Sequence, residues 1–120
     1  MTTTTTAGPA PTGARVQGFT TTAVHAGQAP DPLTGAVIPP VHQTSTFVQD
    51  GINVLRGGHE YSRGSNPTRS AFEAQLAALE HGERAFAFAS GIAAEDALLR
   101  AVLRPGDHVV LGADGYGGTN

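Results

Sequence analysis

Helical apolar periodicity is confined to the second half of this 120-residue sequence, and that division limits what the chain can fold into. Residues 16–65 are punctuated by prolines and glycines, and each proline biases the residue before it toward extended backbone. We therefore expect no stable helix before residue 66. Because such long irregular stretches are uncommon inside a compact domain, residues 16–65 are predicted to form an irregular arm that lies on another surface, either another domain or a neighbouring subunit.

The first fifteen residues are dominated by Thr, Ala, Gly and Pro and contain no apolar run. A segment of this composition buries too little surface to offset its ordering entropy, so residues 1–15 are predicted to be a disordered tail. The sequence also lacks the basic start and apolar stretch of a signal peptide and any run long enough to span a bilayer. We expect a cytoplasmic protein with no membrane partner. The net charge of −3 gives no electrostatic footprint for nucleic acid.

The regular part of the sequence begins at Asn66 and Pro67. Asn is a favoured N-cap residue, and Pro suits the first helical position, where its missing N–H is no loss. Apolar residues then recur at helical spacing until Gly82, a typical C-terminal stop. Arg69 falls in the first turn, where a cation is unfavourable, so we expect it to pair with Glu60 or Glu73 in a structural role.

Two short apolar segments, residues 84–89 and 108–111, flank a second helical pattern from Ile92 to Leu103. This order predicts a βαβ unit with a parallel sheet and a right-handed crossover, which places the chain in the α/β class. Apolar positions of the helix should face the sheet; these are Leu98, Leu99 and Val102. One βαβ unit cannot cover both faces of a parallel sheet, so residues 66–120 are predicted to be the start of a larger α/β domain. The alternative is a chain that must pair extensively with another.

A turn of small residues, Ala89-Ser90-Gly91-Ile92, leads from the first predicted strand into the helix. The amides at such a helix start can bind a phosphate through hydrogen bonds and the positive end of the helix dipole. The alternative is that Gly91 only permits close packing. Ser90 lacks the glycine-flanked elbow of a hydrolase nucleophile.

Two tyrosines are further candidates for a site. In an extended segment Tyr61 and Arg63 point to the same side, and a phenol with a guanidinium can hold one phosphate; the alternative is an ordinary surface pair. Tyr116 lies among glycines after the second predicted strand. Its ring can stack on a planar heterocycle or shuttle a proton, or the segment is only a turn.

Residue types that are missing exclude several chemistries. The sequence has no cysteine, and all seven basic residues are arginine, so it offers no thiolate and no lysine amine for a Schiff base with a carbonyl cofactor. The five histidines show no metal-ligand spacing, and we predict no metal site. The helix carboxylates are interpreted as a solvated face; these are Glu73, Glu80 and Glu83.

Taken together, a series of motifs resembles a known family over about residues 19–120. The motifs are Val24-His25-Ala26-Gly27, Asp31-Pro32-Leu33-Thr34-Gly35-Ala36-Val37, Pro39-Pro40, Thr44-Ser45-Thr46-Phe47, Glu60-Tyr61-Ser62-Arg63, Asn66-Pro67-Thr68-Arg69, Ala87-Phe88-Ala89-Ser90-Gly91-Ile92-Ala93-Ala94, Pro105-Gly106-Asp107-His108-Val109-Val110 and Tyr116-Gly117-Gly118-Thr119. In this order they resemble the N-terminal third of the Cys/Met-metabolism enzymes that use pyridoxal phosphate (PLP). Leu55-Arg56-Gly57-Gly58 is most similar to bacterial cystathionine γ-synthases and γ-lyases.

The resemblance implies an aspartate-aminotransferase-like (fold type I) enzyme, of which this chain carries the arm and the first βαβ of the large PLP-binding domain. It implies that Gly91 and Ile92 bind the cofactor phosphate and that Tyr116 stacks on the pyridine ring and assists proton transfer. It also implies that Tyr61 and Arg63 bind the phosphate of the neighbouring subunit's PLP in a homodimer or homotetramer.

The implied function is γ-replacement or γ-elimination on a sulfur amino acid or O-acylhomoserine, in methionine biosynthesis, transsulfuration or cysteine metabolism. Cystathionine γ-synthase comes first and cystathionine γ-lyase second. The family's Schiff-base lysine, its aspartate that pairs with the pyridine nitrogen and its substrate-carboxylate arginine are expected in later sequence, so these 120 residues alone should be inactive. The alternative is a non-catalytic truncated fragment that serves only as an anion-binding or dimerisation module.

Overall fold

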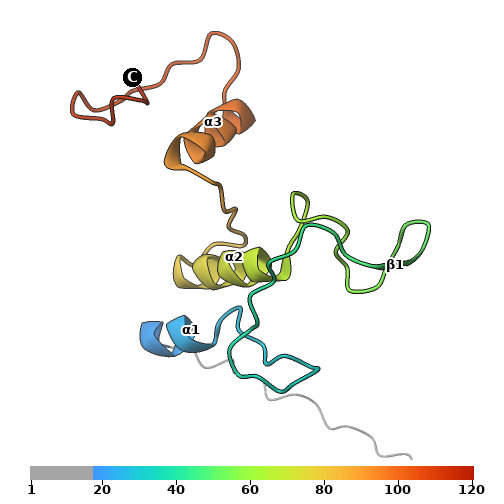
Figure 1. Ribbon diagram of the computed structural model, residues 1–120. Helices are drawn as coiled ribbons and strands as arrows, with labels where there is room; N and C mark the ends of the chain where they lie inside the picture. The colour runs from blue at the N-terminus through green and yellow to red at the C-terminus, as the bar shows by residue number, and fades with distance from the viewer. Residues whose placement is uncertain (1–17) are drawn as a thin grey trace, which may run out of the picture.

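Three helices and one short hairpin form the regular structure of residues 18–120, which are the residues that the computed structural model describes (Figure 1). The helices are α1 (Phe19–His25), α2 (Pro67–Leu79) and α3 (Gly91–Val102), and the hairpin pairs β1 (Gln49–Gly51) with β2 (Val54–Leu55). The predicted tail, residues 1–15, lies outside the described residues.

The expectation that no helix forms before residue 66 is wrong, because α1 occupies Phe19–His25. This helix is too short to be stable alone, and helices of this length depend on tertiary packing. It packs against α2, where the Gln75 side-chain amide donates a 2.5 Å hydrogen bond to the carbonyl of Ala23. The sequence pattern of α1 did not reveal this contact.

Gly27 allows the chain to leave α1 in close contact with α2. Its φ of +69° is in the left-handed region that glycine tolerates. A Cβ at this position would lie 2.3 Å from the carbonyl oxygen of Ala71 and 2.9 Å from the amide of Gln75. The junction therefore needs glycine both for its backbone angle and for its lack of a side chain.

The predicted irregular arm contains a hairpin in its second half. Beyond β1 and β2, Thr46 forms an antiparallel bridge with Tyr61, and the Phe47 amide donates to the carbonyl of Glu60. His59 stabilises this end of the hairpin, because Nδ1 lies 2.8 Å from the Ser65 hydroxyl and its ring packs on Phe47. These contacts place Tyr61 at the base of the hairpin.

Both predicted helices after residue 66 are confirmed, together with the capping of the first. The Asn66 side chain accepts a 2.9 Å hydrogen bond from the Thr68 amide, and Pro67 is the first residue of α2. The Asn66 side-chain amide also donates to the His42 carbonyl and to the Ser62 hydroxyl. Asn66 thus starts α2 and holds it against the arm.

The predicted βαβ unit is not formed within residues 18–120. Residues 84–89 and 108–111 are irregular there, and the only sheet is the β1–β2 hairpin. A strand exists through hydrogen bonds to a neighbouring strand, and these two segments do not provide that neighbour for each other. Their apolar side chains consequently remain exposed, with Val110 96% accessible.

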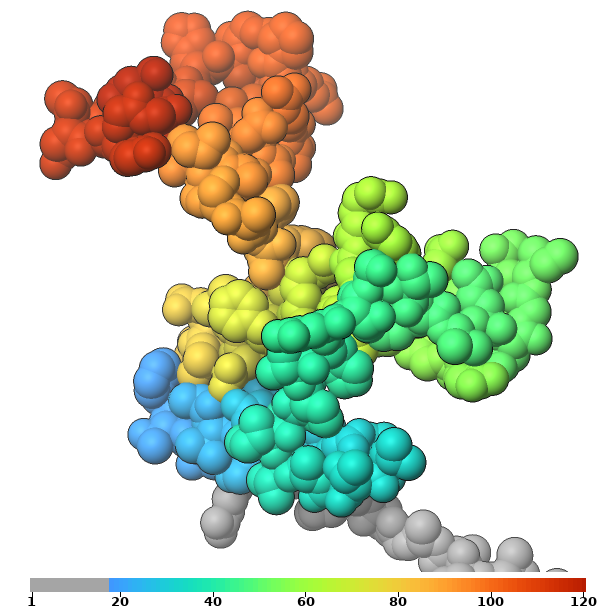
Figure 2. Space-filling model, viewed as in Figure 1, coloured from blue at the N-terminus to red at the C-terminus, as the bar shows by residue number. Residues whose placement is uncertain are grey.

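The described residues have an open arrangement with little interior. Their radius of gyration is 20.4 Å, against about 13 Å for a compact domain of this size. Ala77 and Asn66 are the buried residues, and the predicted inward-facing residues Leu98, Leu99 and Val102 are exposed. Figure 2 shows α3 and the C-terminal segment standing apart from the α1–α2 pair. Among these helices, none combines the length and the apolar character needed to cross a membrane.

Candidate functional site

The first candidate is the start of α3, where two backbone amides have no acceptor within residues 18–120. Ser90 is the N-cap, and its hydroxyl accepts a 3.2 Å hydrogen bond from the Ala93 amide. The Ala94 amide bonds to the Ser90 carbonyl, which leaves the N–H groups of Gly91 and Ile92 unpaired. Such amides, together with the helix dipole, form an anion-binding site.

Gly91 has open space around it in the described part of the chain. A Cβ built on Gly91 would meet no atom within 4 Å, so this glycine does not serve close packing among residues 18–120. The observation weakens the packing interpretation of Gly91.

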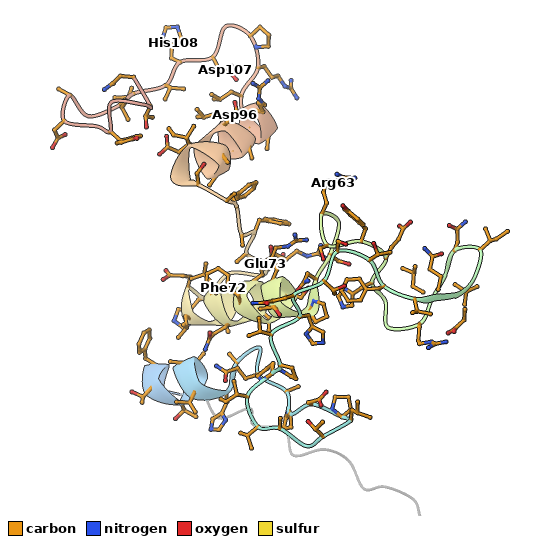
Figure 3. The ribbon with its side chains drawn as sticks, in the orientation of Figure 1. Arg63, Phe72, Glu73, Asp96, Asp107 and His108 are labelled. Atoms are coloured by element: carbon orange, nitrogen blue, oxygen red, sulfur yellow. The ribbon has the colours of Figure 1, made fainter. Side chains whose placement is uncertain are left out.

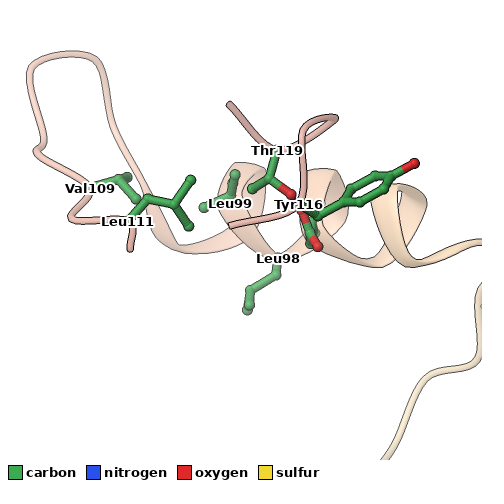
Figure 4. Close-up of a pocket in the computed structure, with 7 residues that line it drawn as sticks. Leu98, Leu99, Val109, Leu111, Tyr116 and Thr119 are labelled. Carbon is green, nitrogen blue, oxygen red and sulfur yellow. The ribbon is translucent and has the colours of Figure 1, made fainter. Parts of the chain in front are cut away.

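The loop that carries Tyr116 lies beside this helix start. A Cβ on Gly118 would lie 2.7 Å from Cε1 of Tyr116 and 3.3 Å from Cδ1 of Ile92, so the Gly118 backbone fits between these two side chains. The Thr119 hydroxyl anchors the loop by donating a 2.6 Å hydrogen bond to Oε2 of Glu95 on α3. Tyr116 itself is 71% exposed, and Figure 4 shows its ring alongside α3 with the hydroxyl directed outward.

A mainly apolar cavity of about 550 Å³ lies next to this loop. Its lining residues come from α3 and from residues 109–119 and are Glu95, Leu98, Leu99, Val109, Leu111, Tyr116 and Thr119 (Figure 4). Neither Gly91 nor Ile92 lines it. We therefore assign this cavity to apolar packing, separate from the free amides of α3.

Tyr61 and Arg63 form a second, separate cluster. The Arg63 guanidinium carbon lies 5.0 Å from the centre of the Tyr61 ring, which is cation–π geometry. Both side chains line an open cavity of about 640 Å³ at the base of the hairpin. Figure 3 shows Arg63 well away from α3, so one chain does not bring this pair together with Gly91, Ile92 and Tyr116.

Arg69 and Glu73 connect α2 to the segment that carries Tyr61 and Arg63 and to Ala87, which precedes α3. Nη1 and Nη2 of Arg69 donate to the carbonyls of Ser62 and Gly64 at 3.0 and 2.7 Å. Nε of Arg69 lies 3.5 Å from Oε1 of Glu73, which confirms the expected structural pairing. The interpretation of Glu73 as a solvated residue is wrong, because its Oε1 accepts a 2.9 Å hydrogen bond from the Ala87 amide.

Two exposed carboxyl groups have perturbed titration. The hydrogen bond from Arg100 lowers the pKa of Asp96 on α3. The Thr34 hydroxyl, which donates to Asp31 at 2.6 Å, lowers the pKa of that carboxyl in the arm. Both shifts favour the charged form of a surface residue. Neither group adjoins the free amides of α3.

Sequence patterns predict some of the hydrogen bonds in these regions but not others. Ser90 followed by a helical pattern is an N-cap signature that predicts its hydrogen bond. The Thr119–Glu95 and Glu73–Ala87 contacts join residues that are distant in sequence, and no local pattern identifies them.

Comparison with known proteins points to one family of enzymes. Residues 20–120 match the family profile of the Cys/Met metabolism PLP-dependent enzymes. The chain is 61% identical over 104 residues to cystathionine gamma-synthase of Mycobacterium tuberculosis, which corresponds to 87% of this chain and 27% of that protein. It is 54% identical over 99 residues to cystathionine beta-lyase of Coxiella burnetii, covering 82% of this chain and 25% of that protein.

The backbone agrees with a solved structure of the same group. The crystal structure of metB from Corynebacterium glutamicum superimposes with a TM-score of 0.81 at 50% identity, over 87% of this chain and 27% of that one. The chain thus spans about a quarter of the length of the proteins that it matches.

Proposed function

Because the chain belongs to the Cys/Met-metabolism family of PLP-dependent enzymes, we propose that its residues supply the phosphate-binding and ring-covering part of a PLP site. The family uses PLP and acts on sulfur amino acids. The observation that carries the proposal is the pair of free amides at Gly91 and Ile92 beside the Tyr116 loop.

The residues present fit this cofactor. Two unpaired amides and a helix N-terminus suit a phosphate, and an exposed phenol ring suits a planar pyridine. Gly91 lets a phosphate approach because nothing lies within 4 Å of its missing side chain. When bound, PLP supplies an electron-withdrawing ring that stabilises negative charge on an amino-acid substrate.

Each candidate site residue has a defined role in this proposal. The amides of Gly91 and Ile92 hold the phosphate, and Tyr116 covers the ring while its hydroxyl holds a proton near the substrate. Tyr61 and Arg63 bind the phosphate of a neighbouring subunit's cofactor, which accords with their distance from α3 (Figure 3). The sequence has no lysine, so the Schiff-base amine must come from outside these 120 residues.

We propose γ-replacement as the reaction, with cystathionine γ-synthase as the activity and cystathionine γ-lyase as the second choice. The 61% identity to the mycobacterial γ-synthase supports the first choice. The assay compares O-succinylhomoserine plus cysteine with cystathionine alone, using the protein that carries these residues. Turnover of the first mixture supports a synthase, and turnover of cystathionine supports a lyase.

The lysine-free sequence favours one alternative, a non-catalytic module that binds an anion or a second copy of the chain. The two functions differ in their products. PLP binding without turnover of either substrate mixture would support the module and contradict the enzyme.

The cofactor site is tested by comparing PLP with pyridoxal, which lacks the phosphate. Gly91→Pro removes one amide donor, and Ser90 with φ −156° and ψ 160° already has the backbone that precedes proline. We expect the preference for PLP over pyridoxal to fall about tenfold in Gly91→Pro, as for loss of one charge-assisted hydrogen bond. Gly91→Ala keeps the amide and serves as the matched control. An unmodified protein that binds both ligands equally would overturn the proposed site.

A further inference from the structure

We propose that Arg69 and Glu73 are positioning residues that fix the two phosphate-binding segments to one helix, α2. This inference rests on the proposed function, since it assumes that residues 61–63 and 90–92 bind cofactor phosphate. The two segments lie on opposite sides of α2 in the sequence. One residue pair near the start of that helix contacts the first segment directly and Ala87, three residues before the second segment.

The first half of the link is the forked contact from Arg69 to the arm. Nη1 and Nη2 bind the carbonyls of Ser62 and Gly64, which flank Arg63. A rigid guanidinium that binds two carbonyls fixes their spacing and orientation. Arg69 thereby sets the backbone from which Arg63 and the adjacent Tyr61 project.

The second half of the link is the Glu73 carboxylate. Its Oε1 accepts from the Ala87 amide, three residues before the N-cap Ser90, and the same oxygen lies 3.5 Å from Nε of Arg69. Within residues 18–120 this is the only hydrogen bond between residues 84–89 and α2. Figure 3 shows Glu73 on the side of α2 that faces the segment leading to α3.

Helix stability alone does not account for this pair. A cation in the first turn opposes the helix dipole, and Arg preceding Glu is the weaker order for an i,i+4 pair. The side chains are 32% and 23% exposed, so the charges are partly removed from water. The pair instead contributes stability through its hydrogen bonds to groups outside the helix, namely two carbonyls and one amide.

The test measures the affinity ratio of PLP to pyridoxal in the protein that carries these residues. Arg69→Met removes every donor, whereas Arg69→Gln retains one amide donor on a shorter side chain. We expect the ratio to fall about tenfold in Arg69→Met and less in Arg69→Gln. Lysine is avoided because it would add a primary amine that reacts with the aldehyde of both ligands.

Glu73 is tested in the same way. Glu73→Gln keeps an oxygen for the Ala87 amide but loses the charge, and Glu73→Ala loses both, so the ratio should fall further in Glu73→Ala. Arg100→Gln breaks an exposed i,i+4 pair that contacts no other segment and should leave the ratio unchanged. If Arg69→Met does not fold, the affinity ratios of Arg69→Gln and Glu73→Gln test the positioning role instead.

The outcomes separate the inference from the function on which it rests. Equal binding of PLP and pyridoxal by the unmodified protein would contradict the proposed phosphate site. A clear preference that survives in all Arg69 and Glu73 variants would overturn the positioning role. Equal weakening of both ligands would also overturn it, because that result indicates a general loss of structure.

Discussion

The hydroxyl of Thr119 donates a 2.6 Å hydrogen bond to Oε2 of Glu95, and this contact joins the Tyr116 loop to α3. The loop is otherwise built from glycines and has few side chains to hold it. Among the described residues, this charge-assisted hydrogen bond and the close approach of Gly118 to Ile92 hold the loop beside the free amides at the start of α3.

Removing that hydroxyl should loosen the loop. A hydrogen bond to a charged group contributes about 1.5 kcal/mol, so Thr119→Val should raise amide hydrogen exchange in residues 115–119 about tenfold. Thr119→Ser retains the donor and should resemble the unmodified protein. Unchanged exchange in Thr119→Val would show that other contacts hold the loop.

Gly27 should be far less tolerant of alanine than Gly35, although both have φ near +70°. A Cβ on Gly35 meets nothing within 4 Å, whereas one on Gly27 would overlap the Ala71 carbonyl. Gly35→Ala should lower the free energy of unfolding by about 1 kcal/mol, because alanine disfavours the left-handed backbone. Gly27→Ala adds a clash of about 1–3 kcal/mol. Urea unfolding of the two variants measures the difference, and equal costs would contradict the close contact of α1 with α2.

Substitutions of Asn66 should have two separable effects, one on the start of α2 and one on the arm. Asn66→Ala removes the N-cap, which costs about 1 kcal/mol, and also the two bonds to the arm. Asn66→Asp retains an acceptor for the Thr68 amide but loses the donor to the His42 carbonyl. Asp should therefore preserve the start of α2, measured by hydrogen exchange, while exchange in the arm rises. Loss of α2 protection in Asn66→Asp would refute this division.

The Asp96–Arg100 pair should stabilise α3 at neutral pH and lose its effect in acid. Arg100 lowers the pKa of Asp96 from its ordinary value of 3.8. A carboxyl with a lowered folded-state pKa contributes stability above its unfolded pKa and loses it as the pH falls through the folded pKa. The stability difference between the unmodified protein and Asp96→Asn should thus be present at pH 7, begin to shrink as the pH falls below 3.8, and vanish below the folded-state pKa of Asp96. A difference that persists at about pH 2 would contradict the ionic origin.

Local signals predicted α2 and α3, and non-local contacts explain the failures. Asn66 and Pro67 specify the start of α2 through their own chemistry, so the sequence sufficed there. The segments 84–89 and 108–111 have the composition of buried strands. A strand also needs a neighbouring strand to pair with, and composition does not identify that neighbour. Likewise, α1 forms by packing on α2, and Glu73 is held by the Ala87 amide, fourteen positions away. The placement of Gly91 at a helix start followed from the pattern, whereas the Gly118 contact with Tyr116 and Ile92 did not.

The contact between α1 and α2 has a consequence for mutational tolerance. It is made by the Ala23 carbonyl, the Gln75 side chain and the bare backbone of Gly27, while Phe19 and Val24 on α1 remain exposed. Among the described residues, Phe19 and Val24 are exposed, so substitutions there should be tolerated better than at Gly27. In a library of single substitutions, Gly27 should therefore accept the fewest replacements of any position in this segment.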